Sequence, residues 1–323
     1  MIDDVGMRST ILSFFNTALN RFAQSAAFGV NNAQRMRRAA RAAAVVLLGL
    51  SLVSGILLTG KERASAATQE DLPERIKALS PEALEEMLVF VAGNTLFTLY
   101  HEAGHMLVSE LGLPVLGQEE DAVDNLATIT MLSRETDDMD LLLSNAMIGW
   151  FLIAEEDYDS LLFYGEHDLD LQRGYQMLCL MVGSDPDAFG DLAIELELPE
   201  ERIETCSFDY DQSVTSWESV TDPHLHPEEQ SAATSKGQIS VRYSAAPEDL
   251  ELLSVFLYES QLMESVAEEL DALYALPSPV TFNAMTCGEE NAYWDPQARE
   301  MTLCYELMAG FADVYLNELY SGG

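Results

Sequence analysis

The chain has few basic residues, few cysteines and none of several motifs that would indicate common functions. Only 16 Lys and Arg stand against 55 Asp and Glu among its 323 residues, so the net charge is −39. This charge would repel phosphates and argues against nucleic acid as a partner. A serine hydrolase is not supported because no G-x-S-x-G motif occurs. A zinc finger is not supported either, because no two cysteines have C-x-x-C spacing.

The rest of the composition is typical of a folded protein. The hydrophobic fraction is 48% and the aromatic fraction is 9%, so disorder is not expected despite the charge. The length is compatible with one large domain or two modest ones. Such an acidic body is compatible with a cationic or metal partner, or with a high-salt habitat.

The N-terminal segment has the pattern of an export signal. Residues 42–60 carry no charge, follow the basic stretch Arg37-Arg38-Ala39-Ala40-Arg41, and precede Ala64-Ser65-Ala66. This order predicts a secretory signal that is cleaved after Ala66. Because the apolar run also just reaches membrane-spanning length, an uncleaved anchor through residues 42–60 is the alternative. The pattern therefore predicts a periplasmic or secreted protein, with membrane anchoring as the alternative.

Four cysteines follow this segment, namely Cys179, Cys206, Cys287 and Cys304. An even count in an exported chain favours two disulfides. Four cysteines allow three connectivities, and we predict the pairing that is local in sequence, Cys179 with Cys206 and Cys287 with Cys304.

Hydrophobic periodicity divides the chain into three parts: residues 1–66, a helical domain at 67–230, and an α+β unit at 237–323 that would complete the same fold. The first long helix is expected to be capped by Ser80, with Pro81 in its first turn, to break near Gly93-Asn94 and to end at Gly112. Further helices are expected at 119–132, 141–154, 171–182, 188–197 and 209–220. The C-terminal unit is expected to hold strands at 238–243, 279–285 and 300–305, a helix at 247–276 and a final helical stretch at 307–320. Residues 291–296 are expected to be extended with a turn. The predicted fold class is α+β, predominantly helical, with a small strand–helix–strand–strand unit.

The sequence His101-Glu102-Ala103-Gly104-His105 lies within the first long helix. Histidines four residues apart project from one face and can bind one Zn²⁺ ion. Glu102 is then beside the metal, where it can act as general base toward water. This H-E-x-x-H pattern is typical of metallopeptidases.

A catalytic zinc ion needs a third protein ligand. Glu120 and Asp124 are four residues apart on the next helix and share one face. We assign Glu120 as the ligand and Asp124 as the residue that orients His101. Asp124 as the ligand is the alternative. The neighbouring Glu119 and Asp121 are interpreted as solvated charges that complement the helix dipole.

Two stretches resemble a known family. Residues 99–105 read LYHEAGH and residues 113–124 read LPVLGQEEDAVD, which resembles the DUF4344 metallopeptidases with their H-E-x-G-H and L-P-V-L-G-R-E-E-D-x-x-D motifs. Gln118 replaces the usual Arg, outside the proposed ligands. The resemblance covers most of residues 81–230, and residues 287–296 and 304–307 are also similar to the family. It implies a zincin-like fold, a peptide or protein substrate, and a C-terminal sheet whose edge could pair with that substrate.

A residue that stabilises the oxyanion is also required. His167 is our choice, as a further catalytic residue, and Tyr175 is the second option. The sequence thus predicts an exported zinc metallopeptidase with His101, His105 and Glu120 as ligands and Glu102 as base. The alternative is a noncatalytic zinc-binding envelope scaffold or regulatory protein.

Overall fold

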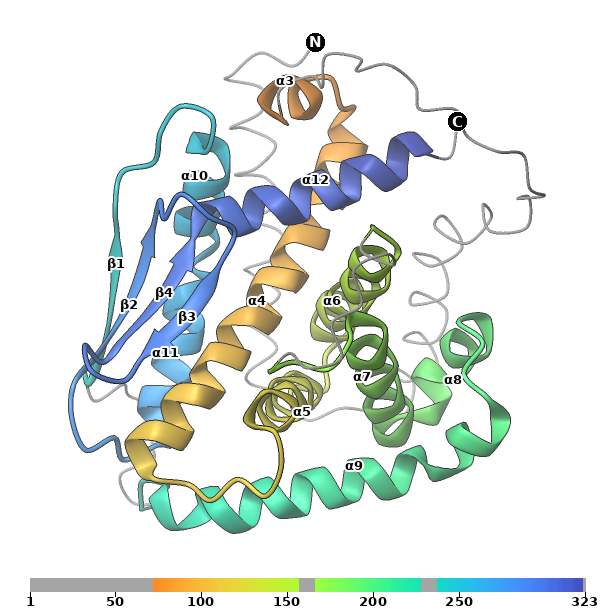
Figure 1. Cartoon of the computed structure of the whole chain (residues 1–323), viewed down its shortest axis with the longest axis vertical. Coiled ribbons are helices and arrows are strands. Elements are labelled where there is room, and N and C mark those ends of the chain that lie inside the picture. The colour runs from red at the N-terminus through yellow and green to blue at the C-terminus, as the bar shows by residue number, and fades with distance from the viewer. Residues whose placement is uncertain (1–71, 157–165, 228–236, 322–323) are drawn as a thin grey trace.

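The computed structural model describes residues 72–156, 166–227 and 237–321 (Figure 1). The predicted signal, the apolar run at 42–60 and the cleavage site lie outside these residues. Within the described parts of the chain, no helix is both long and apolar enough to cross a membrane.

The architecture is α+β and mostly helical, as predicted. The first part contains α3 (Leu72–Lys77), α4 (Pro81–Leu111), α5 (Glu119–Leu132), α6 (Asp137–Glu156), α7 (Asp170–Ser184), α8 (Pro186–Glu195), α9 (Glu200–Thr221) and the 3-10 turn η3 (Asp222–His224). The second part contains β1 (Ile239–Tyr243), α10 (Glu251–Ser260), α11 (Leu262–Leu273), β2 (Val280–Met285), β3 (Ala292–Asp295), β4 (Glu300–Cys304) and α12 (Tyr305–Ser321). Figure 1 shows α4 running between the sheet on one side and helices α5 to α8 on the other, with α9 along the bottom of the view.

Helix α4 begins and ends at the residues that the sequence indicated. The Ser80 hydroxyl accepts a hydrogen bond from the Ala83 N–H, and Pro81 occupies the first turn, where its missing N–H has no cost. The helix ends at Gly112, which has a φ of 64° in the left-handed region that glycine adopts readily.

The predicted break near Gly93 is wrong, because α4 continues through it without interruption. Gly93 instead permits close helix packing, since a Cβ there would clash with the Leu142 carbonyl oxygen of α6. The Asn94 side chain adds to this contact by donating to the Phe90 and Asn145 carbonyl oxygens. Gly93 and Asn94, which the sequence indicated as a helix break, therefore form a packing site between α4 and α6.

The C-terminal part contains one helix and one strand more than predicted. The left-handed Gln261, with a φ of 53°, divides the expected long helix into α10 and α11. Residues 292–295 form β3, and the sheet order is β1-β2-β4-β3. The strands β1, β2 and β4 are parallel, whereas β3 is antiparallel to β4 and forms an edge. In β2, the alternating burial of Val280, Phe282 and Ala284 shows that one face of the sheet packs on the core.

Two polar contacts tie the C-terminal part to α4. The buried Tyr100 donates to Glu269 of α11 at 2.6 Å, and Arg134, just after α5, pairs with the same carboxylate. Farther along α4, Arg299 between β3 and β4 donates to Glu110 at 2.9 Å. Because these contacts lie on either side of the H-E-x-x-H sequence, they fix the sheet beside it.

The predicted disulfides are confirmed. Cys179 of α7 is bonded to Cys206 of α9, with a sequence separation of 27, and Cys287 is bonded to Cys304 at the end of β4, with a separation of 17. The first bond holds α9 on α7.

Replacing both Cys179 and Cys206 with Ala should lower the free energy of unfolding by about 3 kcal/mol, because the bond closes a long loop in the unfolded chain. Urea unfolding under oxidising conditions measures this loss. The Cys287→Ala and Cys304→Ala double variant is the matched comparison and should lose a similar or slightly smaller amount. Equal stability of the first variant and the wild type would contradict the prediction.

Candidate metal centre

The site begins with a close contact between α4 and α5. A Cβ at Gly104 would lie only 2.8 Å from the side chain of Val123, so the two helices approach at a distance that only glycine allows. This contact brings the first turns of α5 against the α4 face that carries His101 and His105. Glu120 therefore reaches both imidazoles.

Three ligand atoms form a nearly equilateral triangle. His101 Nε2 lies 3.1 Å from Glu120 Oε2, His105 Nε2 lies 3.3 Å from the same oxygen, and the two nitrogens are 3.3 Å apart. A tetrahedral zinc site with bonds of about 2.0–2.1 Å has ligand atoms about 3.3–3.4 Å apart. The three predicted ligands thus already have the spacing that such a site requires.

Each histidine has a carboxylate on its other ring nitrogen. Asp124 Oδ1 lies 2.6 Å from His101 Nδ1, as expected for the orienting residue, and Arg173 donates to both oxygens of Asp124 at 2.7 and 2.9 Å. Glu119 Oε1 lies 2.8 Å from His105 Nδ1. Our interpretation of Glu119 as a merely solvated charge is therefore wrong, because the first turn of α5 directs it at His105.

Glu102 lies on α4 beside the two histidines, on the side toward the sheet. Its carboxylate is buried and accepts a hydrogen bond from the backbone N–H of Trp294 in β3. Burial raises the pKa of Glu102 above its ordinary value, and the nearby His101 and His105 only partly oppose that rise. A carboxyl group with a raised pKa is better matched to accepting and returning a proton near neutral pH.

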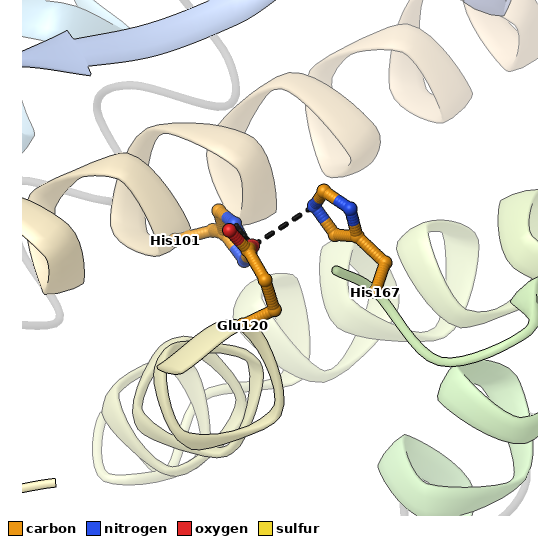
Figure 2. A group of neighbouring side chains, drawn as sticks. All are labelled: His101, Glu120 and His167. Atoms are coloured by element: carbon orange, nitrogen blue, oxygen red, sulfur yellow. Dashed lines mark hydrogen bonds and ion pairs between the residues drawn. The ribbon is translucent and has the colours of Figure 1, made fainter. Parts of the chain in front are cut away.

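His167 also converges on the site, from the segment just before α7 (Figure 2). Its Nε2 lies 2.9 Å from Glu120 Oε2, and its side chain is 49% exposed. One ligand atom each from His101, Glu120 and His167 lie within 4.8 Å of one another. Tyr175, the second option, uses its hydroxyl to donate to the Leu196 carbonyl oxygen instead.

The electrostatics of the cluster favour a positive charge at its centre. Burial alone would lower the pKa of His101, but hydrogen bonds to Asp124 and Glu120 outweigh it and raise the pKa to about 9. Burial opposes ionisation of Glu120, yet its contacts with three imidazoles hold the pKa of this carboxyl far below its usual range. The ionised carboxylate of Glu120 would attract a bound cation in the same way.

These donors suit a zinc ion. Two imidazole nitrogens and one carboxylate oxygen are a common ligand set for catalytic zinc, whereas magnesium and calcium prefer oxygen ligands throughout. A second group of potential ligands, Cys287, Cys304 and Glu306, does not suit a metal. Its sulfurs are bonded to each other, and Glu306 accepts hydrogen bonds from the backbone N–H groups of Cys287 and Gly288.

Comparison with known proteins identifies the family. The DUF4344 family model, described as "Putative metallopeptidase", matches residues 63–220 and 243–322. The chain belongs to this family. Neither the curated proteins nor the solved structures gave a match. The DUF4344 description implies a metal and a peptide or protein substrate, and the match includes α4 and α5 as well as strands β2 to β4 of the C-terminal sheet.

Some residues at this DUF4344 site could not be identified from the sequence. Arg173 of α7 meets Asp124, and Trp150 of α6 lies against Arg173, and only the fold brings these residues together. Trp294 reaches Glu102 across 192 positions of sequence. The contact of Glu119 with His105, by contrast, could have been predicted, because Glu119 directly precedes the proposed ligand Glu120 in the first turn of α5.

Replacing Gly104 with Ala should weaken zinc binding about tenfold. The added methyl group must push α5 away from α4, at a cost of about 1–3 kcal/mol. Because Glu120 moves with α5, restoring its position for metal binding requires this cost, which therefore lowers the zinc affinity. Competition with a chromophoric chelator measures the affinity. A second change, Val123→Gly, removes both side-chain carbons that the methyl group would meet and should restore binding, and failure of this rescue would contradict the explanation.

Proposed function

We propose that this chain is an exported zinc-dependent peptidase of the H-E-x-x-H type. The observation that carries the proposal is the triangle of His101, His105 and Glu120 ligand atoms at tetrahedral spacing, with the buried carboxylate of Glu102 beside it. His101, His105 and Glu120 would hold the ion. When bound, zinc would supply a Lewis acid that polarises the scissile carbonyl group and makes water acidic.

Glu102 would act as general base and then as general acid. Its raised pKa allows the carboxylate to take a proton from the attacking water and later to give it to the leaving amine. The hydrogen bond from the Trp294 N–H fixes the carboxylate, so that the proton is exchanged at a defined place.

The edge strand β3 and His167 support binding of an extended peptide. The backbone N–H of Trp294 in β3 interacts with the Glu102 carboxylate, so Glu102 lies beside the edge strand of the sheet. A substrate strand that paired with this edge would pass its backbone beside the base. His167, half-exposed at the cluster, would donate a hydrogen bond to the developing oxyanion.

Two observations support export. The N-terminal pattern of basic residues, an apolar run and Ala64-Ser65-Ala66 is that of a secretory signal. All four cysteines form disulfides, which persist in oxidising compartments such as the periplasm and the extracellular space. We therefore propose a periplasmic or secreted location.

The variant Glu102→Gln tests the reaction. It should retain zinc with near wild-type affinity but lose about 100- to 10,000-fold in turnover of peptide substrates, because an amide cannot accept the proton. Metal analysis and a fluorogenic peptide library measure the two properties on the same preparations. If the wild-type protein binds zinc but cleaves no peptide, the noncatalytic scaffold is correct instead.

The ligand assignment predicts different results for two carboxylates on α5. Glu120→Ala should abolish stoichiometric zinc binding, whereas Asp124→Asn should only weaken it, by about 10- to 100-fold, because the residue orients His101 without touching the metal. Zinc content after dialysis and chelator competition distinguish the two. The reverse order would make Asp124 the ligand.

A further inference from the structure

A continuous series of contacts leads from His101 away from the metal centre. His101 Nδ1 meets Asp124 Oδ1 at 2.6 Å, and Arg173 binds that carboxylate through Nε at 2.7 Å and Nη2 at 2.9 Å. The Arg173 guanidinium carbon then lies 3.6 Å from the centre of the Trp150 ring. The four residues come from four consecutive helices, α4, α5, α7 and α6.

This series is buried and leaves Asp124 no freedom to turn. The side chains of His101, Asp124 and Arg173 are only 7%, 13% and 10% exposed. Both carboxylate oxygens are engaged, one by His101 and Arg173 and the other by Arg173 alone. A carboxylate clamped in this way fixes the plane of the His101 ring and keeps Nδ1 as the donor, so that Nε2 faces the metal.

Packing alone does not fix the position of Arg173. Together with Phe97 and Asp124, it lines a cavity of about 580 Å³ whose walls come mainly from α5 and α7. On this side the guanidinium has room to move. The Trp150 ring supplies the missing constraint through a cation–π contact, and Phe97 packs edge-on against that ring with centroids 6.3 Å apart.

Among the residues that the structure describes, the second histidine has no such support. The partner of His105 is Glu119, whose side chain is 46% exposed, in contrast to the buried Asp124. The two ligands are thus held unequally, His101 by a buried series of contacts and His105 by a carboxylate in contact with solvent.

We propose that Arg173, held on the Trp150 ring, is a positioning residue that sets the orientation of the metal ligand His101 through Asp124. This inference rests on the proposed zinc site and adds to it the residues that pre-organise one of its ligands. Arg173 acts on the affinity and geometry of the metal, without contact with the substrate.

The test measures metal binding directly in the full-length protein. Zinc affinity is determined by chelator competition, and the visible absorption spectrum of the cobalt-substituted protein reports ligand geometry. Arg173→Met should bind zinc about 10- to 100-fold more weakly and show an altered cobalt spectrum. Arg173→Lys should be intermediate, because it keeps the charge but loses the two-pronged contact.

Trp150 and a second arginine provide matched comparisons. Trp150→Phe keeps an aromatic face and should bind zinc more tightly than Trp150→Leu, which removes the cation–π contact. Arg202→Lys, in the wall of the same cavity but paired with Asp209, should leave the zinc affinity and the cobalt spectrum unchanged.

A double-mutant cycle decides whether Arg173 acts through Asp124. In an Asp124→Asn background, Arg173→Met should change zinc affinity by no more than about twofold, because the intermediate link is already lost. Additive losses would overturn the proposal. So would an Arg173→Met or Arg173→Lys protein that is less stable without metal but binds zinc like the wild type, since Arg173 would then be structural only.

The test of the role of Arg173 can fail or succeed independently of the test of peptidase activity. If the wild-type protein binds zinc but cleaves no peptide, the peptidase proposal fails while the affinities and cobalt spectra still decide the role of Arg173. If the wild-type protein binds neither zinc nor cobalt, both proposals are wrong.

Discussion

The close approach of α4 and α5 at Gly104 is the constraint on which the proposed metal centre depends. A side chain at this position would meet Val123 at 2.8 Å, so the helices could not come close enough for Glu120 to reach two imidazoles on α4. The small residues within His101-Glu102-Ala103-Gly104-His105 are thus part of the site as much as the ligands are. They determine where the third ligand can come from.

Helix α4 serves two sides of the molecule at once. One face presents His101 and His105 to α5, and the adjoining face presents Glu102 to the edge strand β3. The helix can do this because it is continuous and because the sheet is tied to it on both sides of the motif. Residues from distant parts of the described chain therefore meet at the candidate metal site.

The sequence was sufficient for features that depend on local spacing. The His101 and His105 pair, the cap at Ser80 and the end at Gly112 follow from helical periodicity and from rules for helix ends. The role of Gly93 was misread because its consequence lies in a contact with α6, which local sequence does not contain. Arg173 was equally out of reach, since it meets Asp124 from 49 positions away and only through the packing of four helices.

The charge distribution on α5 explains why an arginine is needed at that point. Glu119, Glu120 and Asp121 occupy the first turn, where the helix dipole stabilises negative charge. Asp124 lies one turn further in, where that stabilisation is weaker, and it is buried, so its charge requires a counterion. Arg173 supplies it in a chain with only 16 basic residues. With Asp124 neutralised by Arg173, the charge of Glu120 remains directed at the centre between the imidazoles, where a zinc ion would bind.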